Sequence, residues 1–184
     1  MGRIEAAKGC GEMFQLFLRL QHEGGSAPNL VLLGQEVLPV PFHDNIVHLG
    51  FVPESEKWQA MTACDWLLMP SRYESLSIAL LETWSVGRPA MVNARSRVLV
   101  GHCREPNGGL WYESYEEWCY IISQISSATK ASLGRRGMLY VRNNYTWERI
   151  EQEYLGLFRP SGRTPFSLPR NRVPEDQPYS EEEL

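Results

Sequence analysis

The chain has 184 residues, of which 43% are hydrophobic and 22% are charged, and its formal net charge is −4. This size and composition are typical of one soluble globular domain with a sizeable core. The acidic balance argues against a basic surface that binds nucleic acid, so any phosphate would have to be held by a few placed cations. No apolar run approaches the roughly 20 residues of a membrane span, and Met1 does not open a signal peptide.

The cysteines and histidines do not form the pattern of a metal site. The four cysteines are scattered, without a Cys-x-x-Cys pair, as is typical of reduced thiols in a cytosolic protein. The four histidines have no ligand spacing and no paired acid, and Asp44 and Asp65 belong to no metal motif. We therefore expect neither a metal ion nor a cofactor. The six tryptophans are predicted to lie in the core rather than to stack on sugars.

The N-terminal part of the chain alternates between helical and strand patterns. Apolar residues at helical spacing predict a helix over about 7–21, which a glycine-rich stretch ends. Short apolar runs predict strands over 29–34 and 46–50. A helix over 53–64 and a strand over 65–70, stopped by a proline, follow.

The C-terminal part continues the alternation and defines the fold class. A helix is predicted over 76–84, with Gly87 where a helix C-terminal cap is expected. Continuous apolar strands between helices predict an α/β fold, a Rossmann-like parallel sheet with helices on both faces. Ligands of such sheets bind beyond the carboxyl ends of the strands, here after residues 33, 49 and 69. The remaining predicted elements are strands over 89–93 and 109–112 and helices over about 115–125, 130–141 and 147–158.

Two carboxylates, Glu74 and Glu82, stand in the loop before the helix 76–84 and on that helix. Eight helical residues rise roughly 12 Å, which exceeds the ~5–9.5 Å that separates a hydrolytic carboxylate pair. The helix N-terminus between them, near Leu76 to Ala79, favours an anion. A ligand that fits this arrangement has a hydroxyl-bearing group at each end and an anion between them. A nucleotide sugar has this order, because its diphosphate lies between the sugar and the ribose.

The segment PSRYESLSIALLE resembles the E-x7-E signature of the family-4 (group 1) retaining glycosyltransferases, which have the GT-B fold. The segments GRIEAAKG, IVHLGFVPESEKWQAMTACDWLLMPSRYES and LGRRGMLYVRNNYTWERIEQEY resemble the opening, middle and closing segments of the family, in the same order. The resemblance covers about residues 2–158. It implies that residues 1–159 form the C-terminal, donor-binding half of such an enzyme, without its first strand and its N-terminal acceptor domain. Residues 160–184, rich in proline and ending in an acidic run, are predicted to be a disordered tail.

The resemblance implies catalytic roles for Arg3, Lys8 and Glu74. Arg3 and Lys8 would hold the donor diphosphate and stabilise it as the leaving group, and Glu74 would bind the sugar hydroxyls. No residue is placed as a dedicated nucleophile, and the family's reaction proceeds with retention, by front-face attack of the acceptor. The family also implies that protein cations and a helix terminus replace a divalent metal ion.

The residues predicted to bind the donor follow from the same resemblance. Val52 would meet the base through its backbone, N–H groups at the start of the helix would face the phosphates, and Glu82 would bind the ribose. Ser77 departs from the family, which usually has glycine or proline in this part of the motif, and its side chain narrows the space beside the sugar. The candidate donor-binding residues are Val52, Glu54, Lys57, Ser77, Ile78, Ala79 and Glu82.

The predicted partners are a nucleotide-sugar donor, a glycan, lipid or small-molecule acceptor, and the N-terminal GT-B domain. The chain is expected to be cytoplasmic, with any peripheral membrane contact made by the missing half, and weakly active or inactive alone. Two other functions stay open. One is a GT-B sugar-nucleotide epimerase, which needs proton-transfer carboxylates around the sugar. The other is a noncatalytic or truncated nucleotide-sugar-binding module, which need not keep both Arg3 and Lys8.

Overall fold

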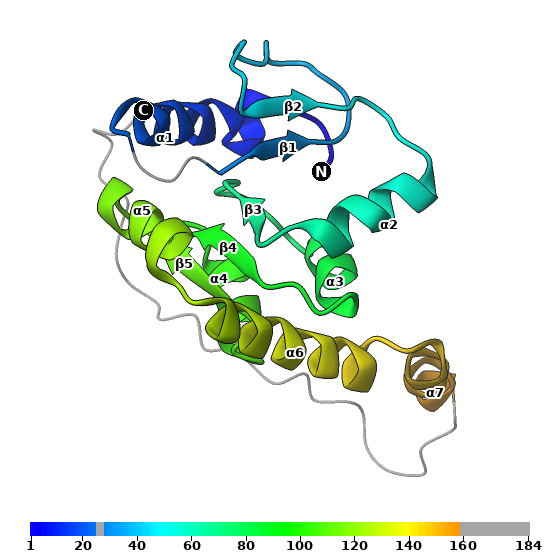
Figure 1. Ribbon diagram of the computed structural model, residues 1–184. Coiled ribbons are helices and arrows are strands. Elements are labelled where there is room, and N and C mark those ends of the chain that lie inside the picture. Colours follow the sequence, from blue (N-terminus) through cyan, green and yellow to red (C-terminus); the bar gives the residue numbers. More distant parts are fainter. Residues whose placement is uncertain (25–27, 159–184) are drawn as a thin grey trace, which may run out of the picture.

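The computed structural model describes residues 1–24 and 28–158, so the predicted tail over 160–184 lies outside the described residues. Strands and helices alternate along the chain, which confirms the predicted α/β class (Figure 1). The helices are the 3-10 turn η1 (Ala6–Lys8), α1 (Cys10–His22), α2 (Glu54–Ala63), α3 (Ile78–Ser85), α4 (Arg97–Arg104), α5 (Tyr115–Gln124), α6 (Ser127–Asn144) and α7 (Trp147–Phe158). The strands are β1 (Leu30–Leu32), β2 (Ile46–His48), β3 (Leu67–Met69), β4 (Ala90–Asn93) and β5 (Gly109–Tyr112).

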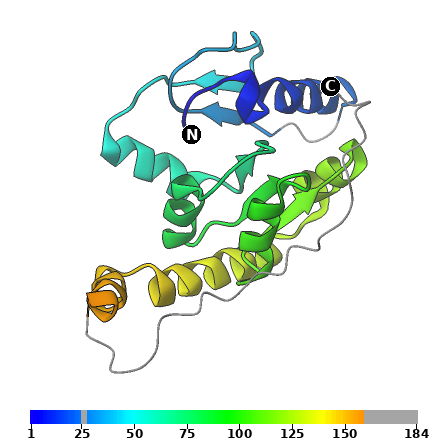
Figure 2. The ribbon, with the colours of Figure 1, turned by 180° about the vertical axis from the view of Figure 1, so that it is seen from behind.

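The strands form two parallel sheets, one of β1 and β2 and one of β3, β4 and β5 in that order. Leu30 pairs with Ile46 in the first sheet, and Met91 pairs with both Leu68 and Leu110 in the second. Figures 1 and 2 show the smaller sheet stacked with α1 at one end of the molecule and α6 at the other. The sequence predicted one sheet, whereas β1 and β3 are hydrogen-bonded to different neighbours and not to each other.

The central strand β4 is buried along its whole length and divides the core in two. Met91 packs with α1, β1 and Trp118 on one face, whereas Val92 packs with Trp84 and Leu99 on the other. Successive side chains of a strand point to opposite faces, so both faces of this sheet are covered by helices. The predicted two-sided burial of the sheet is therefore confirmed, with β4 at its centre.

Helix α6 packs closely on α3 because it presents glycines to it. A Cβ atom at Gly137 would collide with the ring of Trp84, whose Nε1 donates to the Gly108 carbonyl at 2.9 Å. Trp84 and Trp118 are fully buried, as predicted for the tryptophans. The prediction is wrong for Trp147, which is 77% exposed on α7, a helix that has no buried residue, and for Trp111, which is 38% exposed on β5.

The boundaries of several elements differ from the sequence prediction. Helix α3 begins at Ile78 rather than at residue 76, because Ser77 is its N-cap. Helix α4 was missed, although Ser96 caps it by accepting a hydrogen bond from the Leu99 N–H at 3.4 Å. An N-cap serine shortly before apolar residues, here Val98 and Leu99, is a recognisable helix start. Gly87 has a φ of 74° just past α3, as expected of a helix C-terminal cap. Across residues 1–24 and 28–158, no helix is both long and apolar enough to cross a membrane.

Candidate functional site

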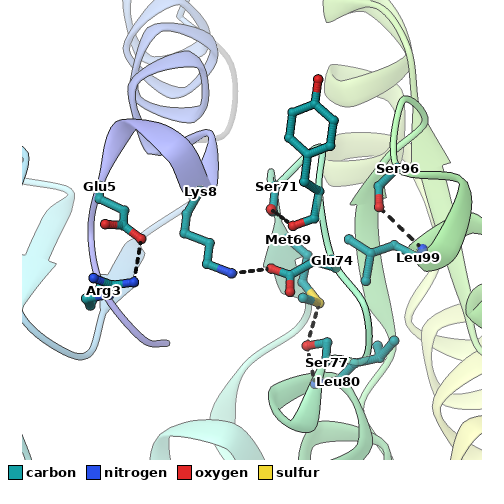
Figure 3. A network of polar contacts seen from close by, with 11 residues as sticks. Arg3, Glu5, Lys8, Met69, Ser71, Glu74, Ser77, Leu80, Ser96 and Leu99 are labelled. Atoms are coloured by element: carbon teal, nitrogen blue, oxygen red, sulfur yellow. Dashed lines mark hydrogen bonds and ion pairs between the residues drawn. The ribbon is translucent and has the colours of Figure 1, made fainter.

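An ion pair links the N-terminal turn to the loop that follows β3. Lys8 Nζ in η1 donates to Glu74 Oε1 at 2.8 Å, although the two residues are 66 positions apart in the sequence. Figure 3 shows Lys8 reaching across toward Glu74 from the other side of the gap between the two segments. The Glu74 side chain is 14% exposed and that of Lys8 is 41% exposed. Two residues predicted to contact one ligand are thus already in contact with each other.

The backbone around Gly9 and Pro70 explains why this contact forms. Gly9 has a φ of 73°, and a Cβ atom there would collide with the Pro70 carbonyl, so a glycine is required for this approach. The Pro70 carbonyl accepts a hydrogen bond from Asn93 Nδ2 at 3.1 Å. The buried Ser71 donates through Oγ to the Tyr73 carbonyl at 3.0 Å. No local sequence pattern marks these positioning residues, because their contacts are made through the tertiary fold.

Arg3 does not take part in the ion pair. Its guanidinium lies 3.4 Å from Glu5 Oε1 and its side chain is 64% exposed. In Figure 3 this pair stands beside Lys8 and away from Glu74. An exposed pair of this kind contributes only about 0–1 kcal/mol, so a stronger anion can compete for the guanidinium.

The start of α3 presents backbone donors next to Glu74. Ser77 Oγ accepts from the Leu80 N–H at 3.2 Å and donates to Met69 Sδ at 3.6 Å, which fixes the helix start on β3. Ile78 is 67% exposed. The N–H groups of Ile78 and Ala79, in the first turn, have no intrahelical acceptor and carry the positive end of the helix dipole. The predicted anion-favouring helix terminus is therefore present, with its first residue at Ile78.

A second charged cluster joins α2 to α3. Lys57 Nζ lies 3.0 Å from Glu82 Oε1 and 2.6 Å from Glu54 Oε1. The hydrogen bonds to Glu54 and Glu82 raise the pKa of Lys57 despite its partial burial. Lys57 and Glu82 are mostly buried, whereas Glu54 is 70% exposed. Val52 is half-buried just before α2.

One cavity of about 880 Å³ contains part of the predicted site. Its lining includes the N-terminal segment up to Lys8, the loop after β3 and the start of α3, whereas the Lys57 cluster and Val52 are not part of the lining. Within the described ranges, no three His, Cys, Asp or Glu side chains are grouped to hold a metal ion. The predicted site residues that line the cavity are Arg3, Lys8, Glu74, Ser77, Ile78 and Ala79.

A domain with parallel strands, whose cations and helix N-terminus meet beyond the strands' carboxyl ends, belongs to the class of Rossmann-like α/β domains. The family model of the glycosyl transferases group 1 matches residues 1–130. The chain therefore belongs to the group 1 glycosyltransferase family. Its fold is that of the C-terminal domain of GT-B glycosyltransferases. No curated protein matches the chain.

Solved structures share this fold at low sequence identity. Sucrose-phosphate synthase from Thermosynechococcus elongatus superposes with a TM-score of 0.68 and 17% identity, over 85% of this chain and 45% of that one. The C-terminal domain of LpcC, a group 1 glycosyl transferase from Francisella tularensis, superposes with a TM-score of 0.63 and 15% identity, over 80% of this chain and 84% of that one. Anabaena HepE in complex with UDP-glucose superposes with a TM-score of 0.66 and 14% identity, over 85% of this chain and 47% of that one. The chain thus spans less than half the length of the synthase and of HepE.

Proposed function

We propose that this chain is the donor-binding domain of a family-4 glycosyltransferase, which transfers a sugar from a nucleotide diphosphate with retention at the anomeric carbon. The Lys8–Glu74 pair, which lines one cavity with the start of α3, carries this proposal. The pair places a cation and a hydrogen-bond acceptor in the same cavity as the free backbone N–H groups of α3. Membership of the group 1 family supports the transfer chemistry.

The charged residues suggest how the donor lies in the site. The diphosphate would face Lys8 and the N–H groups at the start of α3, because both favour an anion. The sugar would lie beside Glu74, whose carboxylate can accept from sugar hydroxyls. The ribose would lie at Glu82, whose carboxylate is held in place by Lys57 Nζ at 3.0 Å. HepE was crystallised with UDP and with UDP-glucose, so these two compounds are the first probes to use.

The reaction requires no nucleophile from this domain. The bond from the anomeric carbon to the phosphate oxygen breaks, and its electron pair stays on the departing diphosphate. The acceptor hydroxyl oxygen bonds to the same face of the anomeric carbon, and its proton passes to the leaving phosphate oxygen. Lys8, Arg3 and the α3 N-terminus stabilise the developing negative charge, an effect that contributes several kcal/mol in a dry cleft. Arg3 joins them by exchanging its weak contact with Glu5 for the diphosphate.

The acceptor contacts belong to a second domain in this proposal. The acceptor, a glycan, a lipid or a small molecule, would approach from an N-terminal GT-B domain that closes the cleft, and any contact with the inner face of a membrane would come from there. This chain alone would bind the donor weakly and turn it over poorly, because water enters the open side of the site.

Calorimetry with UDP tests the donor orientation. We expect Glu82→Ala to raise the Kd for UDP about tenfold, since it removes a charge-assisted hydrogen bond to the ribose. Glu56→Ala is the control, because it removes an exposed carboxylate from the same helix, α2, at a position outside the candidate site. Equal affinity in Glu82→Ala and the parent would contradict the ribose assignment. The anomeric configuration of the product of an active enzyme that contains this domain, read by NMR, tests retention, and an inverted product would contradict it.

A further inference from the structure

A largely buried histidine joins the carboxyl ends of the two strands of the smaller sheet. His48 is the last residue of β2 and pairs in register with Leu32 of β1. Its ring nitrogen Nε2 lies 2.9 Å from the Gly34 carbonyl oxygen, and Nδ1 lies 3.3 Å from Glu36 Oε2. The His48 side chain is 22% exposed. Both nitrogens of the ring therefore face oxygen atoms of the loop that follows β1, residues 33–38.

The same loop holds the N-terminal segment that carries Arg3. The Gly2 N–H donates to the Leu33 carbonyl at 2.9 Å, and the Ile4 N–H donates to the Gln35 carbonyl at 2.8 Å. Arg3 lies between these two anchored residues, so its backbone position follows that of the loop. A residue that fixes the loop therefore also fixes one of the cations of the candidate site.

The histidine and the N-terminal segment both contact Gly34. The Gly34 N–H donates to the Gly50 carbonyl at 2.7 Å, and the Gly34 carbonyl faces the His48 ring. Gly34 has a φ of 124°, and a Cβ atom there would collide with the Gly2 carbonyl, so this close approach requires a glycine. No side chain separates the loop from the N-terminal segment at this point. A shift of the loop at Gly34 is therefore passed directly to Gly2.

The protonation state of the imidazole decides which of its two contacts can form. A carbonyl oxygen only accepts, so Nε2 carries the proton in the contact with Gly34. A carboxylate also only accepts, so Nδ1 can donate to Glu36 only when the ring carries a second proton. The neutral ring turns a lone pair toward the carboxylate instead. An imidazole changes charge between about pH 5 and 8, so a modest change in pH can make or break the contact with Glu36.

Glu36 is the charged partner of the ring among the residues that the structure describes. The turn η1 and the helix α1 cover this face of the smaller sheet, because Leu32, the register partner of His48, packs with α1. Burial raises the pKa of the Cys10 thiol at the start of α1 and lowers the pKa of the Met1 amino group. The charged side chains of the N-terminal segment, of η1 and of the first turn of α1 form other ion pairs, which are Arg3–Glu5, Lys8–Glu74 and Glu12–Arg72.

We propose that His48 is a positioning residue for Arg3 and that it acts when its ring is protonated. The charged ring holds the loop at both Gly34 and Glu36, and the loop holds the residues on either side of Arg3. When the ring loses its second proton, the contact with Glu36 is lost and the N-terminal segment is held less firmly. This inference rests on the proposed function in one respect, the binding of the donor diphosphate by Arg3. Donor affinity should therefore be higher at acidic pH and fall as pH rises through the titration of the imidazole.

NMR of the chain without ligand tests the positioning itself. The amide signal of Ile4 and the ring signal of His48 are followed between about pH 5.5 and 8. We expect both signals to titrate with the same midpoint. Glu36→Gln should reduce the change at Ile4 at least threefold, because a glutamine amide can pair with either form of the ring. An Ile4 signal that does not titrate, or that titrates equally in the parent and in Glu36→Gln, would overturn the proposal.

A control variant accounts for the other histidines. His22→Gln removes an exposed imidazole from the last turn of α1. The titration of Ile4 should be unchanged in this variant. Loss of the Ile4 titration in His22→Gln would assign the effect to the wrong histidine and overturn the proposal.

Calorimetry with UDP at about pH 6 and pH 8 tests the consequence for the donor site. The ratio of the two Kd values should be about threefold larger for the parent than for Glu36→Gln and His48→Phe. Titration of UDP itself is common to all chains and cancels in this comparison. In an Arg3→Gln background the difference should disappear, because His48 acts through Arg3. Equal ratios in the parent and the two variants, or a difference that persists without Arg3, would overturn the proposal.

The two experiments separate this proposal from the proposed function. A parent chain that binds no UDP at either pH would contradict the donor site. The titration of Ile4 would then still decide whether His48 positions the N-terminal segment, because it requires no ligand.

Discussion

Lys8 Nζ lies 2.8 Å from Glu74 Oε1, so a cation and a carboxylate proposed to contact neighbouring parts of one ligand neutralise each other before it arrives. The pair is partly exposed, and such pairs contribute about 0.2–1 kcal/mol to stability. The pair therefore matters for the position of the Lys8 ammonium group rather than for stability. Glu74 keeps the ammonium group pointed into the cavity, where a diphosphate can take it over.

Substitution of Lys8 should separate ligand binding from stability. We expect Lys8→Met to raise the Kd for UDP about tenfold, because a hydrogen bond to a charged group contributes about 1.5–3 kcal/mol. Its free energy of unfolding should fall by less than about 1 kcal/mol. Calorimetry and urea unfolding measure the two quantities. Arg19→Met, which removes an exposed cation paired with Glu23 on α1, is the control and should leave the affinity unchanged.

Substitution of Gly9 should disturb the position of Lys8 more than substitution of another glycine with positive φ. Gly9 and Gly24 both have a positive φ, of 73° and 77°, but only at Gly9 would a Cβ atom collide with the backbone of Pro70. We expect Gly24→Ala to lower the free energy of unfolding by about 1–2 kcal/mol through backbone strain alone. Gly9→Ala should lower the free energy of unfolding by more than this and should also weaken UDP binding. Equal effects of the two substitutions on unfolding would show that the approach to Pro70 can relax.

The cap of α3 should contribute measurable stability. Ser77→Ala removes the hydrogen bond that Ser77 Oγ accepts from Leu80 N–H at 3.2 Å. Loss of an N-cap costs about 1 kcal/mol, which corresponds to a fall in Tm of roughly 2–4 °C for a domain of this size. Ser77→Gly should cost only a few tenths of a kcal/mol. Calorimetric melting curves measure the difference, and Ser75→Ala, at an exposed neighbouring position, should leave the Tm unchanged.

Buried Cys103 should make the fold sensitive to alkali. Burial raises the pKa of its thiol from about 9 to about 12. Above pH 9 the unfolded chain loses this proton first, so the free energy of unfolding should fall by up to about 1.4 kcal/mol per pH unit as pH rises. Below pH 9 the thiol is neutral in both states and has no effect. Urea unfolding at pH 8, 9 and 10 should give a steeper decline for the parent than for Cys103→Ala. Parallel declines would contradict the assignment.

Local patterns in the sequence account for the individual elements and for the family. The apolar runs that became β4 and β5, the cap at Gly87 and the E-x7-E motif are all local signals, and the predicted α/β class follows from their order. Helix α4 has only eight residues, too few for a clear periodic pattern, and its sequence signal is the single N-cap serine, Ser96. The wrong prediction for Trp147 has another cause, because burial of a tryptophan depends on what packs against its helix.

Local sequence patterns are sufficient to predict parallel strands, a helix N-terminus between Glu74 and Glu82, and membership of a glycosyltransferase family. The cation that each glutamate meets depends on the three-dimensional fold: Lys8 pairs with Glu74, and Lys57 with Glu82. The division of the sheet between β1 and β3 depends on it as well. The difference lies in the sequence distance over which each interaction acts. Capping and periodicity act within a few residues, whereas an ion pair across 66 positions depends on where Gly9 allows the backbone to approach Pro70.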